Sequence, residues 1–298
     1  MRIFIILFVV VSFLSSSYAG LITPIPKDTK YDKEGAKIGK ILFFDTMLSK
    51  DKKISCASCH NPSTGWADRR KRSIGVYGQK DRVQTPTILN SVFNFKFFWN
   101  GRADNFKEQI NMTLHNKIEM KMDKVLIEKR VNSSKLYKKL YKSNNITYDM
   151  IVDSLKEFLK SKITPDSKFD KYIKKEIKLT NEEQKGLELF KKLGCITCHN
   201  GVNVGGNSFQ KIGIIFKYKS CSDDRYSITK NIEDKCVYKV PTLRNIELTE
   251  PYFHDGSAKT LKEAIEKMGY YNLGYILNEN EMDSIESFLK TLTGKQVN

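Results

Sequence analysis

Two short stretches of this sequence carry residue types that could hold a metal-containing cofactor. Each reads C-x-x-C-H, and the two copies are Cys56-Ala-Ser-Cys59-His60 and Cys195-Ile-Thr-Cys198-His199. Two thiols at this spacing lie about one helical turn apart, so both can add to the vinyl groups of one haem. The histidine that follows then ligates the haem iron. A zinc site or a redox dithiol would also use paired cysteines.

The surroundings of the two motifs favour haem over zinc and over a dithiol. Tetrahedral zinc would need further soft ligands close to each motif, and the sequence offers none there. A redox dithiol is expected in a βαβ context, whereas this chain is almost wholly helical in pattern. The sequence therefore predicts two covalently bound haems c, with His60 and His199 as axial ligands.

The segments before the motifs also resemble each other, which predicts a tandem of related domains. Gly39-Lys-Ile-Leu-Phe43 precedes the first motif and Gly186-Leu-Glu-Leu-Phe190 precedes the second. The stretch 161–179 is polar and rich in lysine, so we expect the boundary there. The prediction is an all-α chain of two cytochrome c-like domains, 20–176 and 177–298.

Helices that could position the motifs are indicated by apolar spacing and by capping signals. Between 147 and 162 the apolar residues recur at helical spacing. A hydroxyl or amide residue followed three positions later by glutamate marks further helix starts at Thr180, Thr260 and Asn278. The stretch 201–227, rich in Gly, Ser and Lys, is predicted to be loop.

The first 19 residues have the pattern of an export signal. Arg2 precedes an apolar run over 3–14, and Ser17 and Ala19 supply small residues at a cleavage site. The run is shorter than the roughly 20 residues of a membrane span. We therefore expect a signal peptide over 1–19, a periplasmic location and no stable membrane span.

Two cysteines, Cys221 and Cys236, lie outside the haem motifs and have no histidine after them. Disulfides persist outside the cytoplasm, where the export signal places the chain. The sequence therefore predicts a disulfide between these two residues.

The charge of the chain indicates the kind of partner it would attract. It has 51 Lys and Arg against 34 Asp and Glu, a formal net charge of +17. Nucleic acid would suit such a charge, but export and the scatter of the lysines argue against it. We expect a small, acidic, soluble redox protein instead. The sequence leaves the oligomeric state open, a homodimer included.

Longer strings in the sequence resemble the bacterial di-haem cytochrome c peroxidases. The matching strings run in family order from about 35 to 292, and they are Phe98-Trp-Asn-Gly-Arg-Ala103, Gln109, Glu119-Met120, Lys239-Val-Pro-Thr-Leu-Arg-Asn245 and Pro251-Tyr-Phe-His-Asp-Gly256. The same family includes maturation enzymes that oxidise tryptophan residues of a partner protein.

The resemblance implies a division of labour between the two haems. The first haem would be the peroxidatic one, with Glu119 as its distal acid-base group and Gln109 as the neighbour of that group. Trp99 would lie between the haems. The second haem, with His199 and Met268 as axial ligands, would transfer electrons, a task that suits the raised potential of His/Met ligation.

Met268 also bears on the choice within the family. Its spacing from Leu261, Ala264 and Ile265 alone fits a core methionine as well as a ligand. The maturation enzymes carry tyrosine at the matching position, so the methionine favours a peroxidase.

Family members bind calcium where the two domains meet. The positions that match are Gln84, Thr249 and Pro251, although relatives usually have asparagine where Gln84 stands. Backbone carbonyl oxygens of the other two residues would suit this hard cation.

The sequence departs from its relatives around the first haem. Many relatives carry a histidine that blocks the peroxidatic iron, and here the matching residue is Val76. Thr113 replaces a proline, and His115 in the same segment is expected at the surface rather than on the iron. We therefore predict an open sixth position on the first iron. His254 is assigned a structural role.

Together these features predict an enzyme that reduces hydrogen peroxide to water with electrons from a small periplasmic redox protein. Two alternatives stay open. One is a maturation enzyme that oxidises a protein, and the other is a non-catalytic di-haem cytochrome for electron transfer or sensing. Glu119 is the residue that separates the peroxidase from the last alternative.

Overall fold

The computed structural model describes residues 21–296, so the predicted leader over 1–19 lies outside the described residues. Helices make up 45% of the described residues and strands 5%. In the first half the helices are α1 (Lys33–Phe44), α2 (Cys56–Cys59), α3 (Phe106–His115), α4 (Lys124–Ser133), α5 (Lys135–Tyr141) and α6 (Tyr148–Lys160). In the second half the elements are α7 (Lys168–Ile173), α8 (Asn181–Lys192), β1 (Phe209–Lys211), α9 (Tyr226–Thr229), β2 (Val237–Lys239), α10 (Leu261–Met268) and α11 (Glu279–Lys290). Within 21–296 no helix has the length and apolar character needed to cross a membrane.

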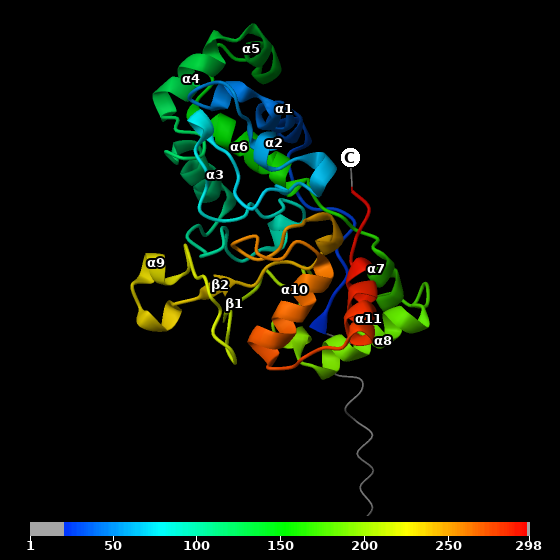
Figure 1. Cartoon of the computed structure of the whole chain (residues 1–298). Helices are drawn as coiled ribbons and strands as arrows, with labels where there is room; N and C mark the ends of the chain where they lie inside the picture. Colours follow the sequence, from blue (N-terminus) through cyan, green and yellow to red (C-terminus); the bar gives the residue numbers. More distant parts are fainter. Residues whose placement is uncertain (1–20, 297–298) are drawn as a thin grey trace, which may run out of the picture.

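The first half is organised around the crossing of α1 and α6 (Figure 1). Gly39 allows the close approach, because a Cβ atom at this position would lie 1.9 Å from the carbonyl oxygen of Ser154. Leu42 and Phe158 are buried in the core that forms there. The helix expected over 147–162 is confirmed as α6, and Thr147 caps it by accepting from the backbone N–H of Met150.

The second half repeats this arrangement with α8 and α11. A Cβ atom at Gly186 would lie 1.9 Å from the carbonyl oxygen of Ser284. The capping boxes expected at Thr180 and Asn278 are both formed. At Thr260 the helix begins as expected, and the threonine side chain accepts from the N–H of Glu263. That box is only half formed, because the Glu263 carboxylate accepts from the N–H of Lys259 instead.

The core of the second half also takes residues from before the expected boundary. Phe169 of α7 and Ile22 near the start of the described chain are buried with Phe288 of α11. The division at residue 176 stays a prediction.

A buried hydrogen-bond junction joins the two halves at Thr164. Asn90 and Asn245 both donate from Nδ2 to Oγ1 of Thr164, at 2.7 and 2.9 Å. Oδ1 of Asn90 accepts from the Thr164 N–H, and Oδ1 of Asn245 accepts from the N–H of Gly294. Both asparagines are left-handed, with φ of 59° and 61°, a conformation that asparagine tolerates. Because the two asparagines have the same backbone conformation and the same kinds of hydrogen bond, the two halves have the same backbone arrangement at this junction.

The repeat continues into the segments that reach the cavity described below. Phe97 bridges to Ala103, and Tyr252 bridges to Ala258 in the same antiparallel manner. The difference in residue number between Phe97 and Tyr252 is the same as that between Asn90 and Asn245. The same difference makes His254 the counterpart of Trp99, and Met268 the counterpart of Thr113.

A small sheet corrects the expectation of continuous loop over 201–227. β1 and β2 pair antiparallel, with Phe209 opposite Lys239. A disulfide joins Cys221 to Cys236 beside this sheet, as the sequence predicted. The protein is therefore mainly helical, with one two-stranded ribbon among the described residues.

Candidate haem-binding site

One cavity of about 410 Å³ extends from the first motif to the second. Its walls come from both halves of the chain and are mainly hydrophobic. Both sets of motif side chains line it: Cys56, Cys59, His60, Cys195, Cys198 and His199. An apolar cavity with a few polar groups is the usual form of a cofactor site.

The first motif is held in place by its own short helix. Ser55 and Ser58 form a capping box around α2, and the His60 N–H donates to the carbonyl oxygen of Cys56 at 2.9 Å. Nδ1 of His60 donates to the carbonyl oxygen of Trp66 at 3.2 Å. This hydrogen bond fixes the proton on Nδ1 and leaves Nε2 with a lone pair for a metal.

The second motif forms a tight turn over Cys195–Thr197, and the His199 N–H donates to the carbonyl oxygen of Cys195 at 3.0 Å. Burial lowers the pKa of His199 to about 4, against the carbonyls of Val204 and Pro241, which raise it. Burial lowers the pKa of His60 as well. Both imidazoles are therefore neutral at pH 7, the form that ligates iron.

None of the four motif cysteines is paired in a disulfide. Burial raises the pKa of Cys56 to about 12 and the pKa values of Cys59 and Cys195 to about 11. A redox dithiol needs a lowered thiol pKa, so this environment does not suit one. Over 21–296 no group of three or more His, Cys, Asp or Glu is arranged to hold a metal ion. The paired thiols, neutral histidines and apolar walls fit covalently bound haem.

Arg102 and Lys239 are among the cationic side chains that line the same cavity, and no role for either was predicted from the sequence. Lys239 is 9% exposed, and burial lowers its pKa to about 8. Arg102 lies over the ring of Phe98 and pairs with Asp223 at 3.2 Å. A buried cation such as Lys239 needs compensating negative charge, which the propionates of a haem would supply. The only sequence signal for Lys239 was a basic residue directly before the Val-Pro-Thr string.

Glu119 lies on a turn after α3 that the loop of residues 73–79 covers. A Cβ atom at Gly75 would lie 1.9 Å from the carbonyl oxygen of Ile118, so only glycine permits this contact. The Val76 N–H donates to the carbonyl oxygen of Glu119 at 2.9 Å. Nδ2 of Asn116 donates to Oε1 of Glu119 at 2.6 Å.

The electrostatic setting of Glu119 raises the pKa of its carboxyl group to about 7. Burial is the largest cause, and the charge of Asp81 adds to it. Arg102 acts in the opposite direction. A carboxyl group with this pKa can both accept and release a proton near neutral pH.

Gln109, the predicted neighbour of Glu119, lines the same cavity. Gln109 and Thr113 of α3 line it together with Glu119. Nε2 of Gln109 donates to Oγ1 of Thr113 at 3.2 Å, which fixes the orientation of the amide. The three residues thus form one polar patch on a largely apolar wall.

The side chains of Val76 and His115 are not part of this patch, although the backbone N–H of Val76 donates to the carbonyl oxygen of Glu119. Val76 is fully buried and His115 is exposed, and neither is among the residues that line the cavity. Nδ1 of His115 is hydrogen-bonded to the carbonyl oxygen of Met122 at 2.8 Å, and its ring stacks on Tyr148.

Trp99 lies at the wall of the cavity where the two halves meet. Its Nε1 donates to the carbonyl oxygen of Gln84 at 2.7 Å. Its ring meets those of Tyr238 and His254 edge-on, at centroid distances of 6.4 and 6.3 Å. His254 is 2% exposed and donates from Nε2 to the carbonyl oxygen of Ser220 at 2.9 Å.

Met268 closes α10 and lines the cavity together with Leu261 and Ile265. It is half-buried, and it occupies the place in the second half that Thr113 occupies in the first. Because the two halves have the same backbone arrangement here, the second half has the thioether of Met268 where the first half has the hydroxyl of Thr113.

The three residues expected to hold calcium also line the cavity. Nε2 of Gln84 donates to the carbonyl oxygen of Asp68 at 3.2 Å, and the hydroxyl of Thr249 donates to that of Ile246. Both side chains therefore have structural partners.

Comparison with known proteins places these features in a family. The model for di-haem cytochrome c peroxidase matches residues 33–178, and the model for cytochrome c matches residues 183–293. The cytochrome c551 peroxidase of Nitrosomonas europaea is 44% identical over 282 residues, which are 92% of this chain and 84% of that protein. The cytochrome c551 peroxidase of Pseudomonas aeruginosa is 34% identical, over 95% of this chain and 87% of that protein. The crystal structure of a MauG-like protein associated with microbial copper homeostasis superimposes with a TM-score of 0.82 at 26% identity, covering 92% of this chain and 93% of that one.

Proposed function

The chain belongs to the di-haem cytochrome c peroxidase family and is a cytochrome c peroxidase, and from this premise we propose how its residues divide the work. Peroxide is reduced beside the first motif. The observation that carries this assignment is Glu119, a carboxyl group with a pKa of about 7 in the wall of the cavity that holds Cys56, Cys59 and His60.

Glu119 moves the proton that breaking the O–O bond requires. Haem c, bound through the motif, would supply the iron and the electrons. Ionised Glu119 takes a proton from one oxygen of peroxide and returns it to the other oxygen, which leaves as water. The remaining oxygen would become the second water with the two electrons that the haem supplies and two protons from solvent. Gln109, oriented by Thr113, positions the peroxide beside this carboxylate. The apolar walls limit the entry of bulk water.

Electrons enter through the second half in this proposal. His199 and Met268 would hold the iron of the second haem, and Trp99, which lines the same cavity, would lie on the electron path between the two motifs. Lys239 and Arg102 would balance the charges of the haem propionates. The first iron would keep an open position, because neither Val76 nor His115 is among the residues that line the cavity.

The location and partners follow from the sequence. We propose that residues 1–19 direct export to the periplasm. The electron donor is a small acidic redox protein, because the chain carries a net charge of +17. Calcium binding at Gln84, Thr249 and Pro251 is part of the proposal, with backbone carbonyls as the main ligands.

The test is the peroxide-dependent oxidation of a reduced cytochrome by the haem-loaded protein. Two cytochromes oxidised per peroxide are expected, because reduction of peroxide to water takes two electrons. A double variant, Cys56→Ser with Cys59→Ser, should keep the second haem and lose turnover. A loaded wild-type protein that leaves the cytochrome reduced would show that the function is electron transfer or sensing.

A further inference from the structure

A row of aromatic rings leads from the cavity to the surface of the second half. Successive ring centroids are separated by 6.4, 4.2, 5.8, 5.0 and 5.0 Å along Trp99, Tyr238, His254, Tyr218, Tyr271 and Tyr270. The first three rings line the cavity, and Tyr270 is 42% exposed. The mechanism proposed above uses only the first ring of this row.

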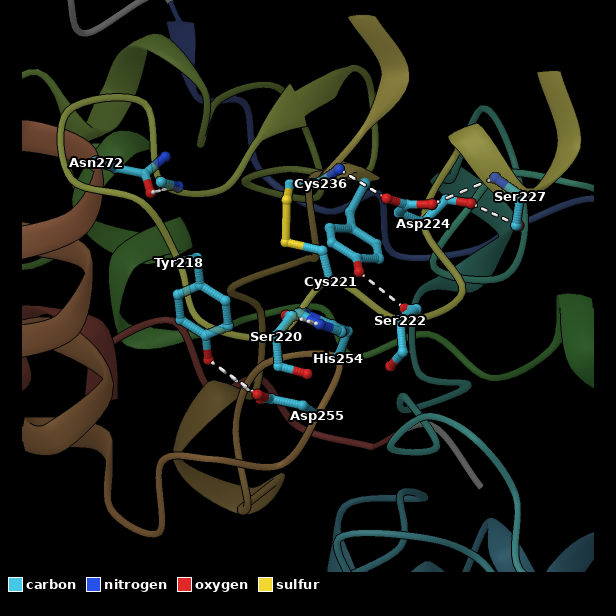
Figure 2. The surroundings of a disulfide bond; sticks show 12 residues. Tyr218, Ser220, Cys221, Ser222, Asp224, Ser227, Cys236, His254, Asp255 and Asn272 are labelled. Atoms are coloured by element: carbon cyan, nitrogen blue, oxygen red, sulfur yellow. Dashed lines mark hydrogen bonds between the residues drawn. A yellow bond between two sulfur atoms is a disulfide. The ribbon is translucent and has the colours of Figure 1, made fainter. Parts of the chain in front are cut away.

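Tyr218 differs from the other tyrosines of the row in its hydrogen bonds. Its hydroxyl lies 3.2 Å from each carboxylate oxygen of Asp255 (Figure 2). It also lies 2.6 Å from Oγ of Ser257. The hydroxyl of Tyr238 donates instead to the carbonyl oxygen of Ser222. A carboxylate can take up the phenolic proton, whereas a backbone carbonyl cannot. Tyr218 is therefore the ring of this row that has a proton acceptor in place.

The surroundings hold Tyr218 firmly in this geometry. It is 6% exposed and packs in a cluster with Ile212, Tyr238 and the disulfide. Cys221 follows it by three residues, so the disulfide anchors the segment that carries the ring (Figure 2). Burial raises the pKa of Tyr218, so the phenol stays protonated in the resting protein.

We propose that Tyr218 is a proton-coupled oxidation site that is used when peroxide reacts before the electron donor has reduced the protein. The proposal rests on the peroxidase function. Hydrogen peroxide takes two electrons, together with two protons from solvent, to give two water molecules. Tyr218 supplies one of the electrons, toward the cavity. A haem iron held at the first motif would supply the other electron, which the electron donor later restores. The phenolic proton moves to Asp255, which leaves a neutral phenoxyl radical beside a carboxylic acid.

The outer part of the row then restores the tyrosine. A one-electron reductant that meets the exposed ring of Tyr270 passes an electron through Tyr271 to Tyr218. Asp255 returns the proton at the same time. The row thus gives the protein a second entry for electrons, from small aromatic or phenolic reductants.

The experiment uses the haem-loaded protein with both irons oxidised. It is mixed with one equivalent of hydrogen peroxide, frozen, and measured by electron paramagnetic resonance, with peroxide consumption followed in the same samples. Protein grown on ring-deuterated tyrosine identifies the radical, because deuteration narrows a tyrosine signal and leaves a tryptophan signal unchanged. We expect a narrowed signal that is lost in Tyr218→Phe and reduced several-fold in Asp255→Asn.

Tyr172→Phe is the matched control. Tyr172 is half-buried in the second half and donates to Gln184, an amide, away from the row. This variant should keep the full signal. Haem absorption and the melting temperature show whether Tyr218→Phe is folded. If this variant does not fold, the effect of deuteration on the wild-type signal still tests whether the radical is on a tyrosine.

The outcomes separate the two proposals. Peroxide consumed with no tyrosine signal, or with a signal that persists in folded Tyr218→Phe, overturns the role of Tyr218 and leaves the peroxidase intact. If no peroxide is consumed, even by protein supplied with reduced cytochrome, the proposed function fails and the oxidation site fails with it.

Discussion

Replacing Glu119 by glutamine separates the catalytic value of this carboxyl group from its structural cost. Glutamine keeps the shape and can still accept the hydrogen bond from Asn116, but it cannot carry the proton. General acid–base groups contribute roughly 10²–10⁴-fold to turnover. The loss corresponds to about 3–5 kcal/mol of activation free energy. Both haems should stay bound, because Glu119 belongs to neither motif.

The same variant should be more stable than the wild type at neutral and alkaline pH. The pKa of Glu119 rises from 4.5 to about 7 in the folded protein, so the folded state disfavours the charged form. Its ionisation therefore costs stability that is absent below pH 4.5, grows between pH 4.5 and 7, and stays constant above pH 7. The shift corresponds to about 3 kcal/mol at the plateau. Glutamine removes this cost.

The assay pairs initial rates of cytochrome oxidation with melting temperatures from pH 4.5 to pH 8.5. Wild-type turnover should rise through pH 7 as Glu119 ionises, whereas the variant should be slow throughout. The difference in melting temperature should be near zero at pH 4.5 and reach several degrees above pH 7. Glu176→Gln, an exposed carboxylate without a side-chain partner among the described residues, is the control. Unchanged turnover in Glu119→Gln, or a stability difference that does not vary with pH, would contradict the role assigned to this carboxyl group.

Three further predictions concern the haems. Replacing Cys195 and Cys198 together by serine should reduce the covalent haem per chain from two to one by pyridine haemochrome assay, and a wild-type ratio of one would contradict the assignment. Met268→His should lower the potential of the second haem in a redox titration, because imidazole favours ferric iron more than a thioether does, and an unmoved potential would make Met268 a core residue. The oxidised protein should show one high-spin ferric centre by electron paramagnetic resonance, and His115→Ala should leave it unchanged. Conversion of a low-spin centre to high spin in that variant alone would show that His115 closes the first iron.

The elements that the sequence predicts well are those set by neighbouring residues. The starts at Thr147, Thr180 and Asn278 are confirmed, because each cap is satisfied within one helical turn. The disulfide is confirmed as well, because only two cysteines remain outside the motifs. The strand β1 was missed, because a three-residue strand depends on pairing with a partner far along the chain.

In the candidate site, too, the sequence does not reveal features that depend on contacts between distant segments. The motifs identify His60 and His199, but the enclosed state of Glu119 depends on Gly75 meeting Ile118 across the fold. The contact of His254 with Trp99 joins segments that are distant in sequence, and spacing does not reveal it. Lys239 reads as one lysine among many until the cavity shows where its side chain lies.

The equivalence of Thr113 and Met268 has a consequence for how such a protein could arise and be redesigned. The two halves share a backbone plan, down to the paired asparagines at the Thr164 junction. The difference in chemistry that we propose for the two halves would therefore come from their side chains rather than from their architecture. In a duplicated electron-transfer protein, one half would need only to replace the methionine at this position and to gain a carboxylate nearby. That half could then act as the catalyst while the other half still transferred electrons. The same few substitutions would be the ones needed to redesign an electron-transfer domain as a peroxidase domain.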